Sequence, residues 1–278
     1  MAKEIEYNAA ERRGVVNFLV RAANDLYVYR FAMYNFITSN LKARYRRSAI
    51  GFFWSLLNPL FTMIIMSVVF STIFKNSLSN FSIYIFSGLL PWAMIYNGMI
   101  VGTNALVHSE RYLKKVYIPK LLFPCVVLSV EVVNFTFSLA SLFLVALFMG
   151  AKISWALLLL PAALLATSLF LLGLIMVASM VNAYFRDLQY IVQVVFSALF
   201  YLTPIVYPLE LISKSTLLYI AVRLNPFMYF VELFHAIIYR AQFPDPAIWF
   251  MCIALTVASL TLGVLVFSAR EKDVIYRL

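Results

Sequence analysis

Four cationic side chains lie close together in the sequence NLKARYRRS, directly before a long apolar run. They are Lys42, Arg44, Arg46 and Arg47. The planar guanidinium group of arginine presents its N–H donors in a fork that matches the oxygens of a phosphate group. Cations at a membrane surface also attract the phosphates of ordinary lipids. The run therefore predicts contact with phosphate groups, and both a specific headgroup and the bulk lipid surface are open as its partner.

The sequence carries no motif for nucleotide hydrolysis, metal binding or nucleophilic catalysis. None of its eight glycines is followed by lysine, which excludes the phosphate-binding motif G-x-x-x-x-G-K-[ST]. Cys125 and Cys252 lie in apolar stretches without a cysteine or histidine at metal-ligand spacing. His108 and His235 fall on opposite predicted sides of a membrane, and no serine has a His–Asp relay on its own side. We therefore expect a chain that is not itself an enzyme and holds no metal or cofactor of its own.

Glu131 is the one acidic residue deep inside an apolar run, at residues 121–149. A carboxylate at the centre of a membrane-spanning helix costs roughly 2.5–3.5 kcal/mol, so it should face protein or water. Such a residue can couple transport to protons or ions, or it can hydrogen-bond to a neighbouring helix. Because the other long apolar stretches offer no second charge for a relay, we favour the hydrogen bond.

Composition places these residues in a polytopic helical membrane protein. Of the 278 residues, 64% are hydrophobic and 12% are charged, whereas a soluble domain carries about a quarter charged residues. The excess cations, a net charge of +10, lie beside apolar runs, so membrane lipids and not nucleic acid are the expected partner. About 20 apolar residues of helix cross a bilayer. The predicted fold is all-α with six spans, at about residues 50–74, 82–107, 121–149, 155–181, 188–209 and 247–269.

The distribution of Lys and Arg predicts how the chain sits in the membrane. With these six spans, 17 of the 22 fall on the side of the N-terminus, as expected for the cytoplasmic side. Both termini are therefore predicted to be cytoplasmic, with residues 1–47 as a lead-in and 270–278 as a charged tail. Apolar residues at helical spacing over residues 25–47 predict an amphipathic helix. It suits the membrane interface, but a solvated helix packed on another domain has the same pattern.

The polar stretch 108–120, HSERYLKKVYIPK, predicts more than a plain loop. Ser109 is placed to cap a short helix through Lys115, and Pro119 disfavours helix just before the next span. An ordinary cytoplasmic loop would explain the cations alone. A compact helix that also bears aromatic residues indicates a docking surface.

Helix-breaking and small residues mark further features. The fifth predicted span ends in TPIVYP, where Pro204 and Pro208 predict an irregular end. Residues 211–224 and 227–239 are apolar, yet each stretch is too short to span comfortably, which indicates re-entrant or interfacial segments. In the second span, Gly98 and Gly102 form a small-xxx-small pair that would let another helix approach closely.

Five stretches of the sequence occur in the order and spacing of a known family. They are RYRRSAIGFFWSLLNPLF at residues 44–61, YLKKVYIPKLLFP at 112–124, NAYFRDLQYIVQ at 182–193, FYLTPIVYP at 200–208 and LNPFMYFVELFHAIIY at 224–239. They resemble the transmembrane subunits of ABC-2-type exporters that move lipid-linked polysaccharides, including O-antigen, capsule and teichoic acid. The resemblance covers the chain from about residue 25 to its end.

The resemblance implies one subunit of a larger transporter. In that family two six-span subunits pair, and each sits on a separate ATPase chain that binds ATP and Mg, which would explain the missing phosphate motif. The substrate would be a lipid-linked glycan, in the first instance of the O-antigen type, exported across a bacterial inner membrane. Exporters of capsule, teichoic acid or small lipophilic compounds are the near alternatives, and a proton-coupled carrier is a more distant one.

The resemblance also gives individual residues expected roles. Contacts with the ATPase would come from Ser109, Glu110, Arg111, Tyr112, Leu113, Lys114, Lys115, Tyr117, Phe185, Arg186 and Asp187. The segment 25–47 resembles the interface helix beside a lateral opening, where Lys42, Arg44, Arg46 and Arg47 would meet the lipid phosphate. Gate helices on the far side would involve Pro204, Tyr207, Pro208, Asn225 and Pro226. Because aromatic rings stack on sugar rings, the expected channel residues are Trp54, Tyr96, Phe200 and Tyr201.

Overall fold

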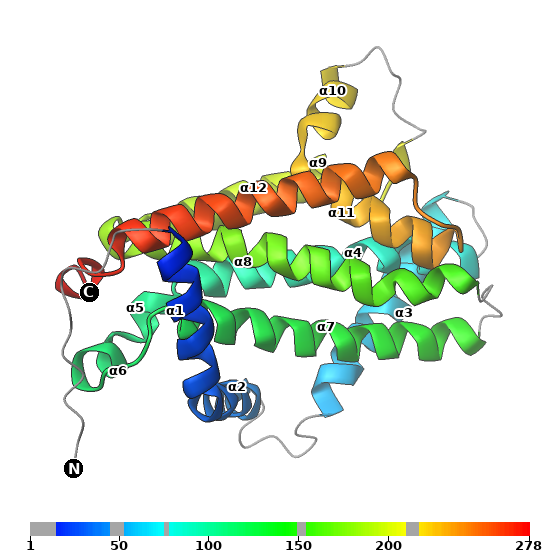
Figure 1. The fold of residues 1–278 in the computed structure, drawn as a ribbon. Helices are drawn as coiled ribbons and strands as arrows, with labels where there is room; N and C mark the ends of the chain where they lie inside the picture. Colours follow the sequence, from blue (N-terminus) through cyan, green and yellow to red (C-terminus); the bar gives the residue numbers. More distant parts are fainter. Residues whose placement is uncertain (1–14, 45–52, 75–77, 149–153, 210–216) are drawn as a thin grey trace.

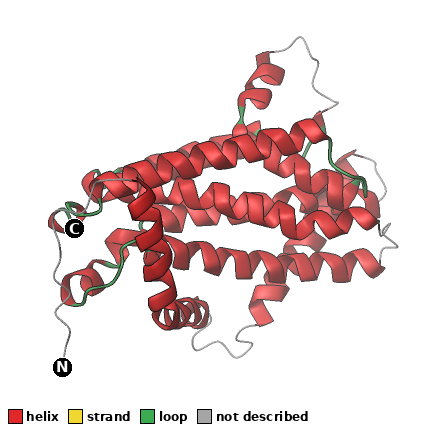
Figure 2. Cartoon of the chain, viewed as in Figure 1, coloured by secondary structure: helices red, strands yellow, loops and turns green. Residues whose placement is uncertain are grey.

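The computed structural model describes residues 15–44, 53–74, 78–148, 154–209 and 217–278. Every regular element within these ranges is helical, which confirms the all-α prediction (Figure 2). Four helical segments are long and apolar enough to cross a membrane, and a bent pair of shorter helices is a fifth candidate. The four are α4 (Leu78–Thr103), α7 (Leu122–Phe148), α8 (Leu160–Tyr184) with the preceding turn η2 (Trp155–Leu159), and α12 (Pro246–Arg270). The chain is therefore a multi-pass membrane protein.

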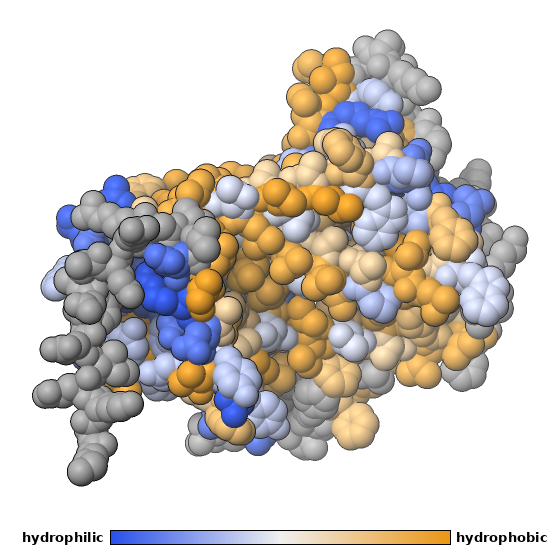
Figure 3. Space-filling view, in the orientation of Figure 1, coloured by the Kyte–Doolittle hydropathy of each residue, from blue (hydrophilic) through white to orange (hydrophobic). Residues whose placement is uncertain are grey.

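The long helices lie side by side in one elongated bundle (Figure 1). At one end lie α5 (Ala105–His108), α6 (Glu110–Lys115) and the C-terminal 3-10 turn η5 (Val274–Tyr276); we call this the α6 end. Toward the other end lie α11 (Pro226–Phe234) and the π-helical turn η4 (His235–Tyr239), which we call the His235 end. Apolar side chains dominate the middle of the face in Figure 3, and hydrophilic ones gather near the α6 end.

Glycines allow helix backbones to touch within the bundle. A Cβ atom on Gly263 of α12 would lie 2.8 Å from the Gly173 carbonyl oxygen of α8, and one on Gly173 would lie 2.4 Å from the backbone of Ser259. The Ser259 hydroxyl also donates to the Phe170 carbonyl, at 3.1 Å. Any larger side chain at Gly173 or Gly263 would force α8 and α12 apart.

The predicted close approach at Gly98 and Gly102 is confirmed. Cβ atoms on these two residues of α4 would lie 2.7 Å from the Leu171 side chain and 2.6 Å from the Ile175 side chain of α8. Both side chains are fully buried. The absence of a Cβ on α4 therefore creates the surface on which α8 packs.

Two predicted spans are shorter or less regular than expected. The first corresponds to α3 (Trp54–Phe74), a 21-residue helix with Pro59 inside it. The fifth corresponds to α9 (Leu188–Leu202), whose 15 residues extend only about 22 Å. The helix stops because Pro204 disfavours helix at Thr203, where the backbone is extended. The irregular end is confirmed, but it begins before residue 209, and the total of six spans stays a prediction.

The predicted amphipathic helix over residues 25–47 is two helices, α1 (Val15–Val28) and α2 (Arg30–Arg44), which meet at Tyr29. The expected polar lead-in is therefore helical from Val15 onward within the described residues. Its apolar anchor is Phe18, which is buried and lies 6.3 Å from the ring of Phe267 in α12. This contact lies between residues far apart in sequence, so local periodicity did not reveal it.

Two local predictions near the α6 end need correction. The second span does not run unbroken to residue 107, because α4 ends at Thr103 and α5 begins after Asn104. The side-chain amide of Asn182 in α8 donates to the Asn104 side chain, at 3.2 Å. Ser109 precedes α6 but makes no capping hydrogen bond through its side chain. Its backbone is not in the extended conformation that favours such a cap.

Between α9 and α12 the chain forms a sharply bent pair. α10 (Leu217–Leu224) projects from the bundle in Figure 1, and α11 with η4 returns into it at an angle of 80°. α10 exposes Leu217 and Leu224, whereas α11 buries most of its side chains. A break of this kind is typical of a broken span or a re-entrant loop.

Candidate functional site

The α6 end presents an exposed surface of aromatic and cationic side chains. Leu113 is buried and anchors α6. The seven other predicted ATPase contacts in the segment are exposed or partly exposed: Ser109, Glu110, Arg111, Tyr112, Lys114, Lys115 and Tyr117. The Lys114 ammonium group donates to the Glu110 carboxylate at 2.7 Å, which lowers the pKa of Glu110. Because this pair faces solvent, it contributes little to folding and leaves a charged surface.

The loop between α8 and α9 joins this surface. Phe185, Arg186 and Asp187 are all exposed. The Arg186 guanidinium donates to the carbonyl of Leu278, at 3.4 Å, and its charge also contributes to the lowered pKa of Glu110. The structure thus brings both groups of predicted contact residues to one end of the bundle, together with the C-terminal turn. Their contact with an ATPase stays a prediction.

Helix α2 and Tyr29, where α1 and α2 meet, touch the segment that carries Tyr112 and Tyr117. The Tyr29 hydroxyl donates to the Tyr117 carbonyl at 3.2 Å. The ring of Phe36 in α2 packs edge-on against Tyr112 at 5.1 Å and against Phe123 at 5.6 Å. The sequence offered no signal for these long-range contacts. They tie α1 and α2 to the α6 end.

A group of partly buried charges lies where α1, α12 and the residues before α7 meet. Burial raises the pKa of Glu271. The charges of Lys120 and Arg21 oppose this shift, and the charge of Asp25 adds to it. Burial lowers the pKa of Lys120, and Glu271 opposes that shift. Burial also raises the pKa of Asp25, against the effect of Arg21. The four charges, Arg21, Asp25, Lys120 and Glu271, thus interact across three segments.

The predicted phosphate contacts are only partly described. Lys42 is exposed in the last turn of α2, and Arg44 is the last residue of that helix. Arg46 and Arg47 lie outside the described residues. The structure therefore places the start of the cationic run at the C-terminal end of α2, where the helix dipole favours a positive charge.

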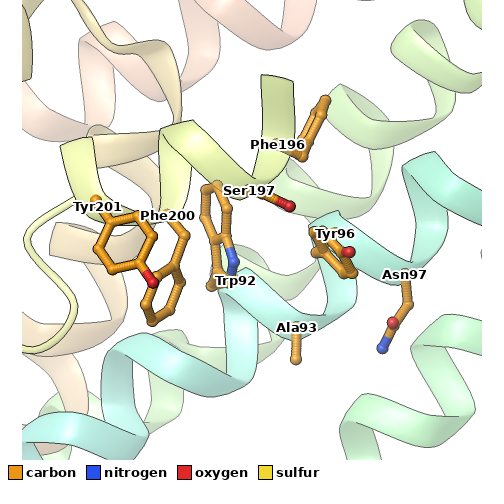
Figure 4. Close-up of a pocket in the computed structure, with 8 residues that line it drawn as sticks. All are labelled: Trp92, Ala93, Tyr96, Asn97, Phe196, Ser197, Phe200 and Tyr201. Atoms are coloured by element: carbon orange, nitrogen blue, oxygen red, sulfur yellow. The ribbon is translucent and has the colours of Figure 1, made fainter. Parts of the chain in front are cut away.

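An aromatic pocket of about 320 Å³ opens between α4 and α9 (Figure 4). Three predicted channel residues line it: Tyr96, Phe200 and Tyr201. The remaining lining residues are Trp92, Ala93, Asn97, Phe196 and Ser197. Trp92 and Phe196 were missed by the sequence prediction, although each lies four residues before a predicted ring on the same helix face. A channel role for these rings stays a prediction.

The fourth predicted aromatic, Trp54, lines a separate polar hollow of about 210 Å³ between α3, α4 and α7. Six polar side chains contribute to it: Asn58, Thr62, Asn97, Glu131, Asn134 and Ser138. Glu131 is only 3% exposed, so it faces protein and not lipid. The aromatic pocket and the polar hollow share Ala93 and Asn97 on α4.

The predicted gate residues lie at the base of the bent pair. Asn225 caps α11 by accepting from the Phe227 amide at 3.0 Å, and its own amide donates to the Thr203 hydroxyl at 2.8 Å. The Tyr207 hydroxyl donates to the Tyr201 carbonyl at 2.8 Å. Pro204 is buried, and Pro208 and Pro226 are partly buried. These contacts join the end of α9 to the start of α11, and gating stays a prediction.

A buried hydrogen-bond cluster holds η4 against α4. The His235 Nε2 atom lies 3.2 Å from the Pro204 carbonyl oxygen, and Nδ1 lies 2.7 Å from the Ser87 hydroxyl. Because a carbonyl can only accept, the ring proton is assigned to Nε2. The Ser87 hydroxyl lies 2.7 Å from both Nδ1 and the Tyr84 carbonyl oxygen, so these two acceptors share its single proton. The Tyr84 ring stacks on the imidazole with centroids 4.5 Å apart, and a Cβ on Gly88 would lie 2.7 Å from it.

Comparison with known proteins identifies the family of the chain. A family model described as ABC-2 type transporter matches residues 33–239. The chain belongs to the ABC-2 type transporter family. This ABC-2 permease is 30% identical to the O-antigen export system permease protein RfbA of Myxococcus xanthus, over 92% of its own length and 98% of that protein. It is 27% identical to the RfbA permease protein of Klebsiella pneumoniae, over 67% and 73% of the two lengths.

The family assignment confirms the resemblance seen in the sequence. The match begins within α2 and ends at the last residue of η4, so it includes α5 and α6, the aromatic pocket and the His235 end. The chain is thus an ABC-2 permease homologous to O-antigen export permeases.

Proposed function

We propose that this permease is the membrane subunit of an ATP-driven exporter of a lipid-linked polysaccharide of the O-antigen type, acting across a bacterial inner membrane. The observation that carries the proposal is the similarity to an O-antigen export permease along nearly the full length of both chains. Two copies of the permease would pair, and two copies of a separate ATPase subunit would bind ATP and Mg. Six spans and cytoplasmic termini would place the α6 end in the cytoplasm.

The α6 end suits the docking of the ATPase subunits. Its exposed side chains include Tyr112, 52% exposed, Tyr117, 71% exposed, and Phe185, 49% exposed. Exposed aromatics surrounded by charges are typical of protein interfaces. Since α6 and the 185–187 loop also touch the last turn of the chain, movement of an ATPase bound there would reach α8, α9 and α12 together.

The remaining sites fit a route for the substrate. The cations Lys42, Arg44, Arg46 and Arg47 would hold the lipid phosphate where α2 ends. The aromatic pocket would contact the glycan through ring faces, which accept many sugars because stacking does not depend on one hydroxyl pattern. The bent pair, with Asn225 and Pro226 at its turn, would close the far side.

Deletion of the gene in its native host tests the proposal. We expect lipid-linked polymer to accumulate inside the cell and surface polymer to disappear, with both restored by the wild-type gene. Unchanged surface polymer in the deletion strain would refute the export function.

The ATPase contact is tested with the purified complex. Truncation of Tyr112 and Tyr117 to alanine should abolish stimulation of the ATPase by the permease, because it removes the aromatic part of the docking surface. A matched control is Trp155→Ala, since Trp155 is 79% exposed and lies in η2, which precedes α8 at the end away from the 185–187 loop. Equal stimulation by the wild type and the double variant would remove the docking assignment.

A further inference from the structure

The polar hollow between α3, α4 and α7 carries an inference beyond the permease's family role. Its polar groups come from three helices and face one volume: Asn58 and Thr62 from α3, Asn97 from α4, and Glu131, Asn134 and Ser138 from α7. Polar side chains at membrane depth are costly unless they meet protein, water or a ligand. Their convergence on one hollow therefore calls for an occupant as well as for helix contacts.

The hydrogen-bonding state of these groups leaves capacity for a ligand. The Asn134 side-chain amide is buried at Nδ2 and has no hydrogen-bond partner among the described residues. The hydroxyls of Thr62 and Ser138 donate to carbonyls of their own helices, at 2.9 and 3.0 Å, so their lone pairs can still accept. The hollow thus offers both a buried donor and acceptors.

The chemistry of the lining selects a neutral polyhydroxyl ligand. None of the residues that line the hollow is cationic, so the hollow offers no charge to balance a phosphate. A single carboxylate is also a poor set of ligands for a metal ion. A sugar residue carries hydroxyls that donate to a carboxylate and accept from an amide, and it has apolar faces that fit Trp54. The hollow is large and polar enough to hold several water molecules, which would occupy it when no ligand is bound.

We infer that the polar hollow binds one sugar residue of the exported polymer through its hydroxyl groups. The inference rests on the proposed function, and it separates two kinds of contact. The aromatic pocket stacks on ring faces, whereas the polar hollow distinguishes hydroxyl patterns and so contributes specificity. Ala93 and Asn97 line both sites, so a glycan can contact the two without leaving α4.

Cysteine labelling tests whether the hollow is wet and whether glycan fills it. The variant Ser138→Cys is made in a C125A/C252A background and treated in permeabilised cells with a charged methanethiosulfonate reagent. The probe is the host's own lipid-linked polymer, present in one strain and absent from a strain that lacks the transferase that starts it. Thr136→Cys is the matched control, because Thr136 lies on the exposed side of the same helix.

We expect Ser138→Cys to react about tenfold faster than Thr136→Cys in the strain without polymer, because a thiolate forms in water and not in lipid. In the strain with polymer its rate should fall about fivefold, as expected when the hollow is filled about four-fifths of the time. The control should not change. Equal rates in both strains, or no reaction at all, would overturn the inference.

A filling substitution provides a second readout. Asn134→Leu should reduce surface polymer about fivefold at unchanged protein level and unchanged ATPase stimulation, because it removes the donor and occupies the space. Normal surface polymer with this variant would overturn the sugar site. The gene deletion tests the export function separately, so failure of the sugar site would not refute the export function.

Discussion

The two ends of the bundle satisfy their polar groups in opposite ways. At the His235 end, neutral groups from α4, η4 and the turn after α9 hydrogen-bond to one another in a buried cluster. At the α6 end, charges and aromatic rings face outward, and the Glu110–Lys114 pair is exposed. A buried cluster must be complete within the chain, since an unpaired buried group is costly. The polar groups of an exposed surface can be satisfied by water or by another chain. The difference therefore separates a cluster that is complete within the chain from a surface suited to a partner.

Loss of the His235 imidazole should reduce the stability of the permease more than any other change considered below. His235→Ala removes the imidazole from the Pro204 carbonyl and the Ser87 hydroxyl, which keep only their hydrogen bonds with Tyr84, and opens a cavity beneath the Tyr84 ring. We expect the free energy of unfolding to fall by about 3 kcal/mol. The measurement is thermal unfolding of the purified permease in detergent. Phe243→Ala, at a residue 68% exposed, is the control and should leave the midpoint unchanged.

A side chain at Gly88 should have the next largest effect. In Gly88→Ala the new Cβ would lie 2.7 Å from the His235 ring, so the imidazole must shift away from Ser87 or from Pro204. The expected loss is about 1–3 kcal/mol, as for other overpacked sites. Combined with His235→Ala the loss should largely disappear, because the clashing ring is gone. Simple additivity of the two changes would contradict a contact between them.

Near the α6 end, Glu271→Gln should change how stability varies with pH more than it changes the stability itself. The pKa of Glu271 is raised above its ordinary value of 4.5 because the side chain is partly buried. The folded state therefore holds the proton more tightly than the unfolded state, and stability falls as the pH rises from 4.5 through the folded pKa. Glutamine cannot ionise, so this decline should become shallower. Unfolding midpoints measured from pH 4 to pH 8 would show the change, and a steeper decline would contradict it.

The smallest effect on stability should come from the exposed pair of the α6 end. Lys114→Ala removes the ammonium group that faces Glu110, but solvent replaces the lost interaction. We expect no measurable change in the unfolding midpoint of the permease alone. A clear loss of stability would mean that the α6 end is as self-sufficient as the His235 end, and the contrast between the two ends would fail.

Sequence reasoning recovered features that depend on local composition. The third and last spans, expected at 121–149 and 247–269, are found as α7 at Leu122–Phe148 and α12 at Pro246–Arg270, because length of the apolar run determines them. Pro204 marked the irregular end of α9 in the same local way. The close approach at Gly98 and Gly102 also followed from residue size alone.

Features that depend on distant residues were not accessible from the sequence. His235 and Ser87 are 148 positions apart, and neither has a neighbour that reveals the other. The docking of Phe18 on Phe267, and hence the helix that begins at Val15, follows from a partner near the other end of the chain. The aromatic pocket was found in part. Phe200 and Tyr201 lie in the family stretch at 200–208, and Tyr96 was predicted from its aromatic ring, whereas Trp92 and Phe196 became visible only when α4 met α9.

The backbone contact between Gly173 and Gly263 limits how the permease can move. Two helices that touch without intervening side chains cannot slide or roll past one another, because the bulkier residues above and below each glycine would collide. We therefore expect α8 and α12 to move as one unit. Under the proposed export function, movement of α3 relative to α4 would reshape the polar hollow, and movement of α9 would reshape the aromatic pocket, because each helix forms one wall of that site.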